Sequence, residues 1–325
     1  MAVSVSSQTQ SDRKFRLQVM VAFALVYVLW GSTYLAIAIA VQHIPPLMMG
    51  GVRFLIAGAL MLAWRAFVGH TVTVSRRDMF RLTVIGILLL TTGNVVLGWA
   101  ETLIPTGLAA LLIAITPMWF LLLERLSHRG DRISGRGLMG IALGLCGVVV
   151  LLWPDLTGGV HVGRRELLGA GLVLFSSFSW ANGSILSKRW HISVDPYTAS
   201  GWQMLMAGMI NLALAFLTGE HHRTQWAGNS VAAIVYLIIA GSLIGFTAYV
   251  WLLRNVPTPK VATYAYVNPI VAVFLGWLVL DEKITPYILG GSAIVILSVA
   301  LVTGAKSHAR EVEDETEVPA CETGD

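Results

Sequence analysis

Residues 28–58 read VLWGSTYLAIAIAVQHIPPLMMGGVRFLIAG, and residues 178–208 read FSWANGSILSKRWHISVDPYTASGWQMLMAG. A constant offset of 150 aligns Trp30 with Trp180, Pro46 with Pro196, Arg53 with Gln203 and Gly58 with Gly208. Further along, an offset of 152 aligns Trp99 with Trp251, Pro105 with Pro257 and Pro117 with Pro269. Because similarity at a fixed spacing marks an internal repeat, these stretches predict two copies of one structural unit.

The composition indicates the environment in which these two copies fold. Of the 325 residues, 56% are hydrophobic and only 12% are charged, whereas a soluble domain has about 25% charged residues. Apolar runs of about 20 residues, each long enough to cross a bilayer as a helix, follow one another along the chain. They predict an all-α integral membrane protein with ten transmembrane helices near 19–41, 46–64, 82–100, 106–123, 136–153, 166–187, 197–217, 231–252, 261–280 and 285–304.

The distribution of basic residues predicts the orientation, because Lys and Arg are retained on the cytoplasmic side of a membrane. With the N-terminus inside, most of the 22 Lys and Arg residues fall in inner segments. The outer segments then hold Arg164, Arg165, Arg223 and Lys283. Five helices per copy is an odd number, so the two copies cross the bilayer in opposite directions and both termini are cytoplasmic. The positive charges are spread over short loops, so no nucleic-acid partner is expected.

The resulting organisation has five parts. They are a cytoplasmic N-terminal tail (1–18), a first repeat with helices 1–5 (19–153), an external linker (154–165), a second repeat with helices 6–10 (166–304) and a disordered acidic cytoplasmic tail (305–325). Cys146 lies inside the fifth helix and Cys321 in the acidic tail, so a structural disulfide is not expected.

Inverted repeats are typical of secondary transporters, where the two copies take unlike conformations around a central site. A channel is the alternative with the same symmetry. The sequence has no H-x-x-x-H pattern, no paired Asp and no Walker motif, so we expect neither an enzyme nor ATP-driven transport, and neither a cofactor nor a metal. A membrane receptor or scaffold without flux is the remaining alternative from another class.

Two longer segments resemble a known family. They are WGSTYLAIAIAVQHIPPLMMGGVRFLIAGALMLAW in the first half and RNVPTPKVATYAYVNPIVAVFLGWLVLDEKIT in the second. Both resemble the EamA repeats of the drug/metabolite transporter superfamily, which includes the YedA-type inner-membrane exporters of bacteria, and the resemblance spans about residues 20–304. It implies a ten-helix secondary carrier of the bacterial inner membrane that exports small metabolites or drugs through a central cavity. Import or exchange of polar solutes, such as amino acids or nucleotide sugars, remains the alternative.

Arg53 is a basic residue inside an apolar run, about two turns from the outer end of the second helix. Such a residue faces a wet cavity or a partner more often than lipid. Three roles stay open: helix packing or gating, direct contact with substrate, and snorkelling to the outer headgroups. The neighbouring Gly50, Gly51 and Gly58 would let another helix approach closely.

Other polar and aromatic residues within the predicted spans have the same two readings, as pathway lining or as packing. Together with Arg53 the substrate-pathway candidates are Trp30, Ser32, Thr33, Asn94, Trp180, Asn182, Ser184, Gln203, Tyr264, Tyr266 and Asn268. Pro117 and Pro269 predict kinks in the fourth and ninth helices, because proline frees a backbone carbonyl. Glu101 is the candidate for coupling to protons, although it falls at a helix end. The expected partners are a small-molecule substrate and the lipid bilayer, and a homodimer stays open.

Overall fold

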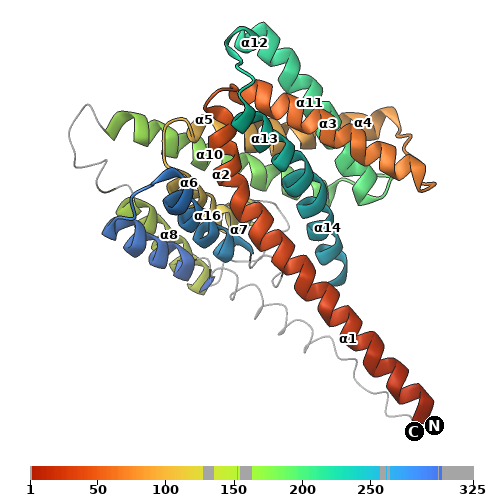
Figure 1. Ribbon diagram of the computed structural model, residues 1–325. Helices are drawn as coiled ribbons and strands as arrows, with labels where there is room; N and C mark the ends of the chain where they lie inside the picture. Colours follow the sequence, from red (N-terminus) through yellow and green to blue (C-terminus); the bar gives the residue numbers. More distant parts are fainter. Residues whose placement is uncertain are drawn as a thin grey trace.

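The computed structural model describes residues 2–126, 135–151, 153, 163–256, 261, 264–298 and 300–301. These residues form helices joined by turns and contain no strand, which confirms the all-α prediction for this part of the chain (Figure 1). The acidic tail 305–325, most of the linker and the side chain of Tyr266 lie outside what is described.

The first repeat begins with α1 (Ala2–Leu25), a π-helical stretch η1 (Val26–Trp30) and α2 (Gly31–Val41), which follow one another without a break. It continues with α3 (Pro46–Phe67), α4 (Arg76–Gly86), the π-helical η2 (Ile87–Val95), α5 (Val96–Ala100), α6 (Thr106–Ile113), α7 (Thr116–Leu126) and α8 (Gly135–Leu151). The far end of α1 projects away from the other helices and carries the N-terminus (Figure 1).

The second repeat resembles the first, but its first helix has no π-helical stretch, it has an extra short helix, and one continuous helix replaces the pair α6 and α7. It comprises α10 (Gly163–Arg189), α11 (Pro196–Leu217), the short α12 (Glu220–Arg223), α13 (Gly228–Tyr236), the π-helical η3 (Leu237–Gly245), α14 (Phe246–Asn255), α16 (Tyr264–Leu280) and a further helix, Pro286–Ser298. A helical segment therefore occupies each of the ten predicted ranges.

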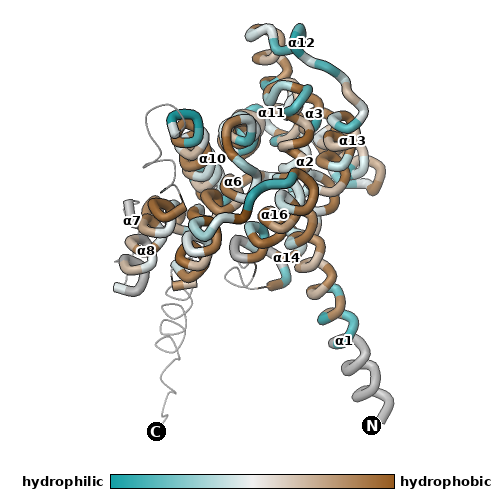
Figure 2. Tube along the Cα trace, turned by 60° about the vertical axis from the view of Figure 1, so that its left-hand side comes forward, coloured by the Kyte–Doolittle hydropathy of each residue, from teal (hydrophilic) through white to brown (hydrophobic). Residues whose placement is uncertain are grey.

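Five helical stretches are long and apolar enough to cross a membrane on their own. They are Arg13–Val41, Pro46–Phe67, Arg76–Ala100, Pro196–Leu217 and Gly228–Leu252. Shorter apolar helices include Thr106–Phe120 and Val267–Leu280. Apolar residues cover the length of the helices, and hydrophilic residues gather at their ends, for example around α12 (Figure 2). Exposed side chains such as Leu60, Phe216 and Leu217 suit a lipid environment. The chain is thus a multi-pass membrane protein, while the count of ten crossings and the orientation remain predictions.

Proline residues define several helix boundaries. Pro46 and Pro196 lie at the first positions of α3 and α11, where the missing N–H has no helical partner to lose. The interruption between α6 and α7 lies at Ala114 and Ile115, and Pro117 is the second residue of α7. Pro269, by contrast, lies inside the continuous helix α16.

Equivalent helices of the two repeats, α3 and α11, pack against each other through glycines (Figure 1). A Cβ atom on Gly51 would lie 2.7 Å from the side chain of Leu212, and one on the equivalent Gly201 would lie 2.9 Å from Leu62. Since Leu62 and Leu212 are also 150 positions apart, the two contacts are copies of each other. As residue numbers rise along α3 the contacted numbers fall along α11, so the helices run antiparallel.

The centre of this helix pair shows the same reciprocity. A Cβ atom on Gly58 would collide with the backbone nitrogen of Leu205, and one on Gly208 with the backbone nitrogen of Leu55. Only glycine permits two backbones to approach this closely. Reciprocal contacts between antiparallel copies are what a local twofold axis between α3 and α11 produces.

The π-helical stretches η2 and η3 are a second pair of equivalent elements, again 150 positions apart. Gly93 in η2 lies against Trp180, and Gly245 in η3 lies against the equivalent Trp30. Each stretch therefore packs against the first long helix of the other repeat. One-turn π-helical irregularities occur often at functional sites, and here both stretches contact the other repeat.

Candidate functional site

Arg53 lies in the interior, between the two repeats. Its side chain comes from α3, its Nε donates to Ser242 Oγ in η3 (3.0 Å), and one terminal nitrogen donates to Asn94 Oδ1 in η2 (3.1 Å). Arg53 is only 5% exposed. Because its polar head is bound to both π-helical stretches inside the protein, the snorkelling reading does not fit the structure.

The charge of Arg53 has neutral partners. Among the described residues the ion pairs involve other basic side chains, and the partners of Arg53 are an amide, a hydroxyl and the ring of Phe54, 4.8 Å from the guanidinium carbon. Gly241 leaves space beside the guanidinium, since a Cβ atom there would lie 3.2 Å from the second terminal nitrogen. At the equivalent position the second repeat has the neutral Gln203, which is also buried. The interior is therefore asymmetric in charge although its backbone is nearly symmetric.

Three aromatic rings form a cluster close to the end of η1. The ring of Trp30 lies 4.8 Å from that of Tyr249 and 5.3 Å from that of Tyr264, and the two tyrosine rings are 5.9 Å apart. Trp30 Nε1 donates to the carbonyl oxygen of Gly241 (3.2 Å), which fixes the indole against η3. The structure thus brings the candidates Trp30 and Tyr264 together and adds Tyr249, which lies in α14 and carries no local sequence signal for this role.

Small polar residues near Trp30 and Trp180 bond mainly to their own helices. Ser32 and Thr33 donate to the carbonyl oxygens of Leu29 and Trp30. Asn182 and Ser184 do the same with the carbonyls of Phe178 and Trp180. Such back-bonding is the ordinary behaviour of short polar side chains in helices, so in this conformation each of these four side chains has a partner in its own helix.

Ser32 makes one further contact that the sequence did not indicate. Its hydroxyl lies 2.6 Å from the hydroxyl of Tyr236, which is 204 positions away at the end of α13. Among the other candidates, Asn268 is buried and its Oδ1 has no hydrogen-bond partner among the residues that the structure describes, while the carbonyl of Asn268 lies beside Gly31. The residues described around this centre therefore come from η1, α2, α3, η2, η3, α14 and α16, that is, from both repeats.

Two sets of polar contacts tie the repeats together at opposite ends of the α3 and α11 pair. At the predicted outer end, Met48 N donates to Glu220 Oε2 (3.1 Å), and Gln225 N donates to the carbonyl of His43 (2.9 Å). The side chain of His43 also bonds to Ser230 (3.1 Å). We call these contacts the outer tie.

At the predicted inner end the tie is ionic. Arg65 pairs with Asp195 (3.1 Å), and Asp78 accepts from the hydroxyl of Ser193 (2.6 Å). Desolvation raises the pKa of Asp195, but hydrogen bonds from Thr198 and Arg65 and the charge of Arg65 outweigh it, so the pKa lies below its usual value. We call these contacts the inner tie.

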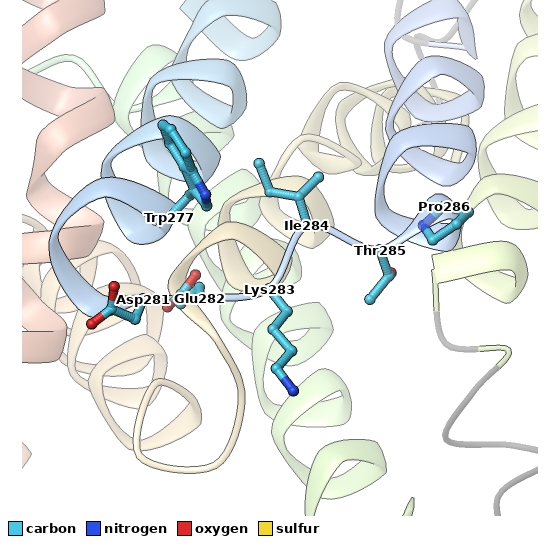
Figure 3. Close-up of a pocket in the computed structure, with 7 residues that line it drawn as sticks. All are labelled: Trp277, Asp281, Glu282, Lys283, Ile284, Thr285 and Pro286. Carbon is cyan, nitrogen blue, oxygen red and sulfur yellow. The ribbon is translucent and has the colours of Figure 1, made fainter.

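Glu101 directly follows α5 and is buried, with 9% exposure, and neither carboxyl oxygen has a hydrogen-bond partner in the part of the chain that the structure describes. The sequence placed Glu101 at a helix end, where water would be expected, but the fold covers it. The acid that follows α16, Glu282, lines an open pocket with Trp277, Asp281 and Lys283 (Figure 3). This pocket lies at the end of α16 and does not include Arg53 or the aromatic cluster.

Comparison with known proteins identifies the class. The EamA-like transporter family matches residues 18–153 and again residues 167–304. The two matches cover most of the chain, so this protein belongs to the EamA-like transporter family. The family assignment agrees with the membrane-spanning helices and with the two repeats seen in the fold.

Individual relatives support the same class. The chain is 38% identical over 285 residues to the protein named Uncharacterized inner membrane transporter YedA of Escherichia coli (strain K12), covering 87% of this chain and 90% of that protein. It is 27% identical to a Probable amino-acid metabolite efflux pump of the same strain, over 84% and 90% of the two chains. One crystal structure, at 20% identity, matches 91% of this chain and 98% of its own with a TM-score of 0.64, which shows the fold alone.

Proposed function

We propose that this protein is a secondary transporter of the bacterial inner membrane that exports small metabolites or drugs by alternating access between its two repeats. The reciprocal packing of α3 and α11 carries the proposal. Two equivalent helices related by a local twofold axis give two conformations of equal backbone geometry, one open to each side, when the repeats exchange their shapes.

The interior residues supply a pathway for such a cycle. Arg53 binds η2 of its own repeat and η3 of the other repeat, so a movement of one repeat against the other changes its partners. A guanidinium with neutral partners can receive an anionic group of a substrate without first losing an ion pair. The cluster of Trp30, Tyr249 and Tyr264 offers apolar faces with polar tips, which suit flat or amphipathic molecules.

Export is favoured over import by the relatives, one of which is named as a probable efflux pump of amino-acid metabolites. An amphipathic amino-acid derivative has a carboxylate for Arg53 and an apolar side chain for the aromatic cluster. Uptake or exchange of polar solutes uses the same architecture and is the alternative in the transport class.

The test is transport by the full chain reconstituted in vesicles that contain radiolabelled amino acids, nucleobases or organic cations. Release that depends on the protein is expected for at least one pool. The Arg53→Ala variant should lose most of this flux while its melting temperature in detergent shows that it folds. Arg165→Ala, at an exposed arginine, is the matched control and should transport like the wild type.

Each outcome decides one part of the proposal. Absence of flux for every pool, with folded and inserted protein, would contradict transport and favour a receptor or scaffold. Flux that Arg53→Ala leaves unchanged would keep the transporter but remove Arg53 from its pathway. Uptake without release would replace export by import.

A further inference from the structure

Glu101 is a buried acid for which the described structure supplies no compensating donor. Both carboxyl oxygens have essentially no contact with solvent and no hydrogen-bond partner among the described residues. An ionised carboxylate in such a site is costly, whereas the neutral acid is tolerated. The absence of donors therefore distinguishes Glu101 from an acid that stabilises the fold.

Glu282 is the opposite case, although it interacts electrostatically with Glu101. Its carboxylate accepts from the backbone nitrogen of Thr106 (2.6 Å), from the hydroxyl of Thr106 (2.5 Å) and from the backbone nitrogen of Gly107 (3.1 Å). These donors belong to the first turn of α6, where the helix dipole favours negative charge. The three donors and the helix dipole therefore favour a negative charge at Glu282, and such a charge disfavours a second one on Glu101.

Among the described residues, no basic side chain forms an ion pair or a hydrogen bond with Glu101. Glu282, from the segment after α16, binds the first turn of α6, which begins five residues after Glu101. Of the helices packed against α5, α3 carries Arg53, which is bound to Asn94 and Ser242. Of the other elements packed against α5, α2 carries Tyr34 but no charged side chain, and η2 carries no charged side chain. Helix α10 has in its first turn the exposed Arg164 and Arg165 and the half-buried Glu166.

Glu282 also lies at a pocket that is open to solvent. It lines the open pocket at the end of α16, on the predicted outer side of the membrane, where Ile284, Thr285 and Pro286 form the opposite part of the lining (Figure 3). Glu282 thus lies at the pocket, while Glu101, five residues before the helix start that Glu282 binds, is buried.

We propose that Glu101 is the proton-binding residue of the transport cycle, loaded from the outer side past Glu282. The inference rests on the transport function proposed above and adds its energy source. In this conformation the carboxyl of Glu101 holds one proton taken from the outer solution. When the repeats exchange conformations, the proton leaves to the inner solution and the carboxylate reforms. One proton thus moves inward for each substrate that moves outward.

The protonated state can be tested without knowing the substrate. Dicyclohexylcarbodiimide modifies protonated carboxyls in apolar surroundings, and peptide mass spectrometry of the reconstituted full chain locates the adduct. Glu101 should be modified at neutral pH, with an adduct yield about tenfold or more above that of Glu282, because the environments differ so strongly. Modification of Glu282 with no adduct on Glu101 at neutral or acidic pH would overturn the proposal.

Coupling is tested with the vesicles described above, using whichever pool the wild type transports. The measurement compares release with an inward proton gradient to release at equal pH. In Glu101→Gln, which retains the shape of the neutral acid, the ratio of the two rates should fall to about one, while exchange of labelled for unlabelled substrate continues. Glu101→Asp should retain a gradient effect, and the control Glu166→Gln should behave like the wild type.

The outcomes separate the two proposals. If the wild type shows no flux for any pool, the transport function itself fails. If the wild type transports but a proton gradient has no effect, or if Glu101→Gln responds to the gradient as the wild type does, transport stands and Glu101 is not its proton site.

Discussion

The starts of α3 and α11 are equivalent in the two repeats but are stabilised differently. α11 carries its own cap: Asp195 accepts from the backbone nitrogens of Tyr197 (3.0 Å) and Thr198 (3.3 Å). The position before α3 is Pro45, which has no capping side chain, and the acceptor for Met48 N is Glu220 from the other repeat.

The outer and inner ends of the α3 and α11 pair therefore differ in their hydrogen bonds and ion pairs, although the two helices are equivalent. Opening the outer tie removes the acceptor of Met48 N, whereas opening the inner tie separates Arg65 from Asp195 and leaves the cap of α11 intact. An unsatisfied buried N–H costs more than a partly exposed ion pair contributes. We therefore expect the two ends to differ in how easily they open.

The largest expected effect comes from the close contact between α3 and α11 at Gly58 and Gly208, which lies between the outer tie and the inner tie. Gly58→Ala and Gly208→Ala place a Cβ atom against a backbone nitrogen, so each should lower the free energy of unfolding by about 1–3 kcal/mol or more. Thermal unfolding in detergent measures this loss. Gly171→Ala is the control, because its Cβ atom would meet nothing within 4 Å. Clearly unequal effects of the two variants would show that the crossing is less symmetric than its contacts indicate.

The next effect concerns Glu220, which accepts a hydrogen bond from the first turn of α3 at the outer end. Glu220→Ala leaves the buried Met48 N without an acceptor, so a loss of about 1–3 kcal/mol in unfolding free energy is expected. Glu220→Gln retains an oxygen acceptor and should lose less than half as much. Both variants are compared by thermal or denaturant unfolding. Equal losses for the two would mean that the charge of Glu220 matters and that the hydrogen bond does not.

A smaller and divided effect is expected at the inner end. Asp195→Ala removes both the cap and the ion pair, and should cost about 0.5–2 kcal/mol, the range for helix caps. Asp195→Asn retains the capping oxygen and loses only a partly exposed ion pair, which is worth about 0–1 kcal/mol. The same unfolding assay measures both. If Asp195→Asn were as harmful as Asp195→Ala, the ion pair and not the cap would hold this end.

The smallest effect is a dependence on pH at the inner end. The pKa of Asp195 is lowered in the folded protein, so its contribution to stability is complete above the usual Asp pKa and is lost as the pH falls through the lowered value. Melting temperatures measured from neutral to acidic pH should therefore fall less steeply in Asp195→Asn than in the wild type. Parallel curves would remove Asp195 from the acid response.

Local sequence features were enough to predict the helices. Apolar runs, their charged borders and the prolines at positions such as 46, 117 and 196 act within a few residues, so they fix where a helix begins or breaks whatever surrounds it. The π-helical stretches η1, η2 and η3 were not predicted. A π-helical turn has no comparably local sequence signal, and it depends on the helix that packs against it.

The sequence predicted many of the residues of the candidate site but not which residues they contact. The sequence selected Arg53, Asn94 and Trp30, and the structure joins Arg53 to Asn94, but the contacts of Arg53 with Ser242 and of Ser32 with Tyr236 connect residues about 200 positions apart. Nothing in a single sequence specifies which helix of the other repeat will face a given side chain.

By itself the sequence determined that this protein is an all-helical membrane protein made of two related halves, since hydropathy and repetition are properties of the chain. Only the tertiary structure decided which polar groups are paired. Among the described residues it placed three donors around Glu282 and none around Glu101, although both acids follow apolar helices. The reason is physical: burial and hydrogen bonding are set by neighbours in space, and in this fold those neighbours come from the other repeat.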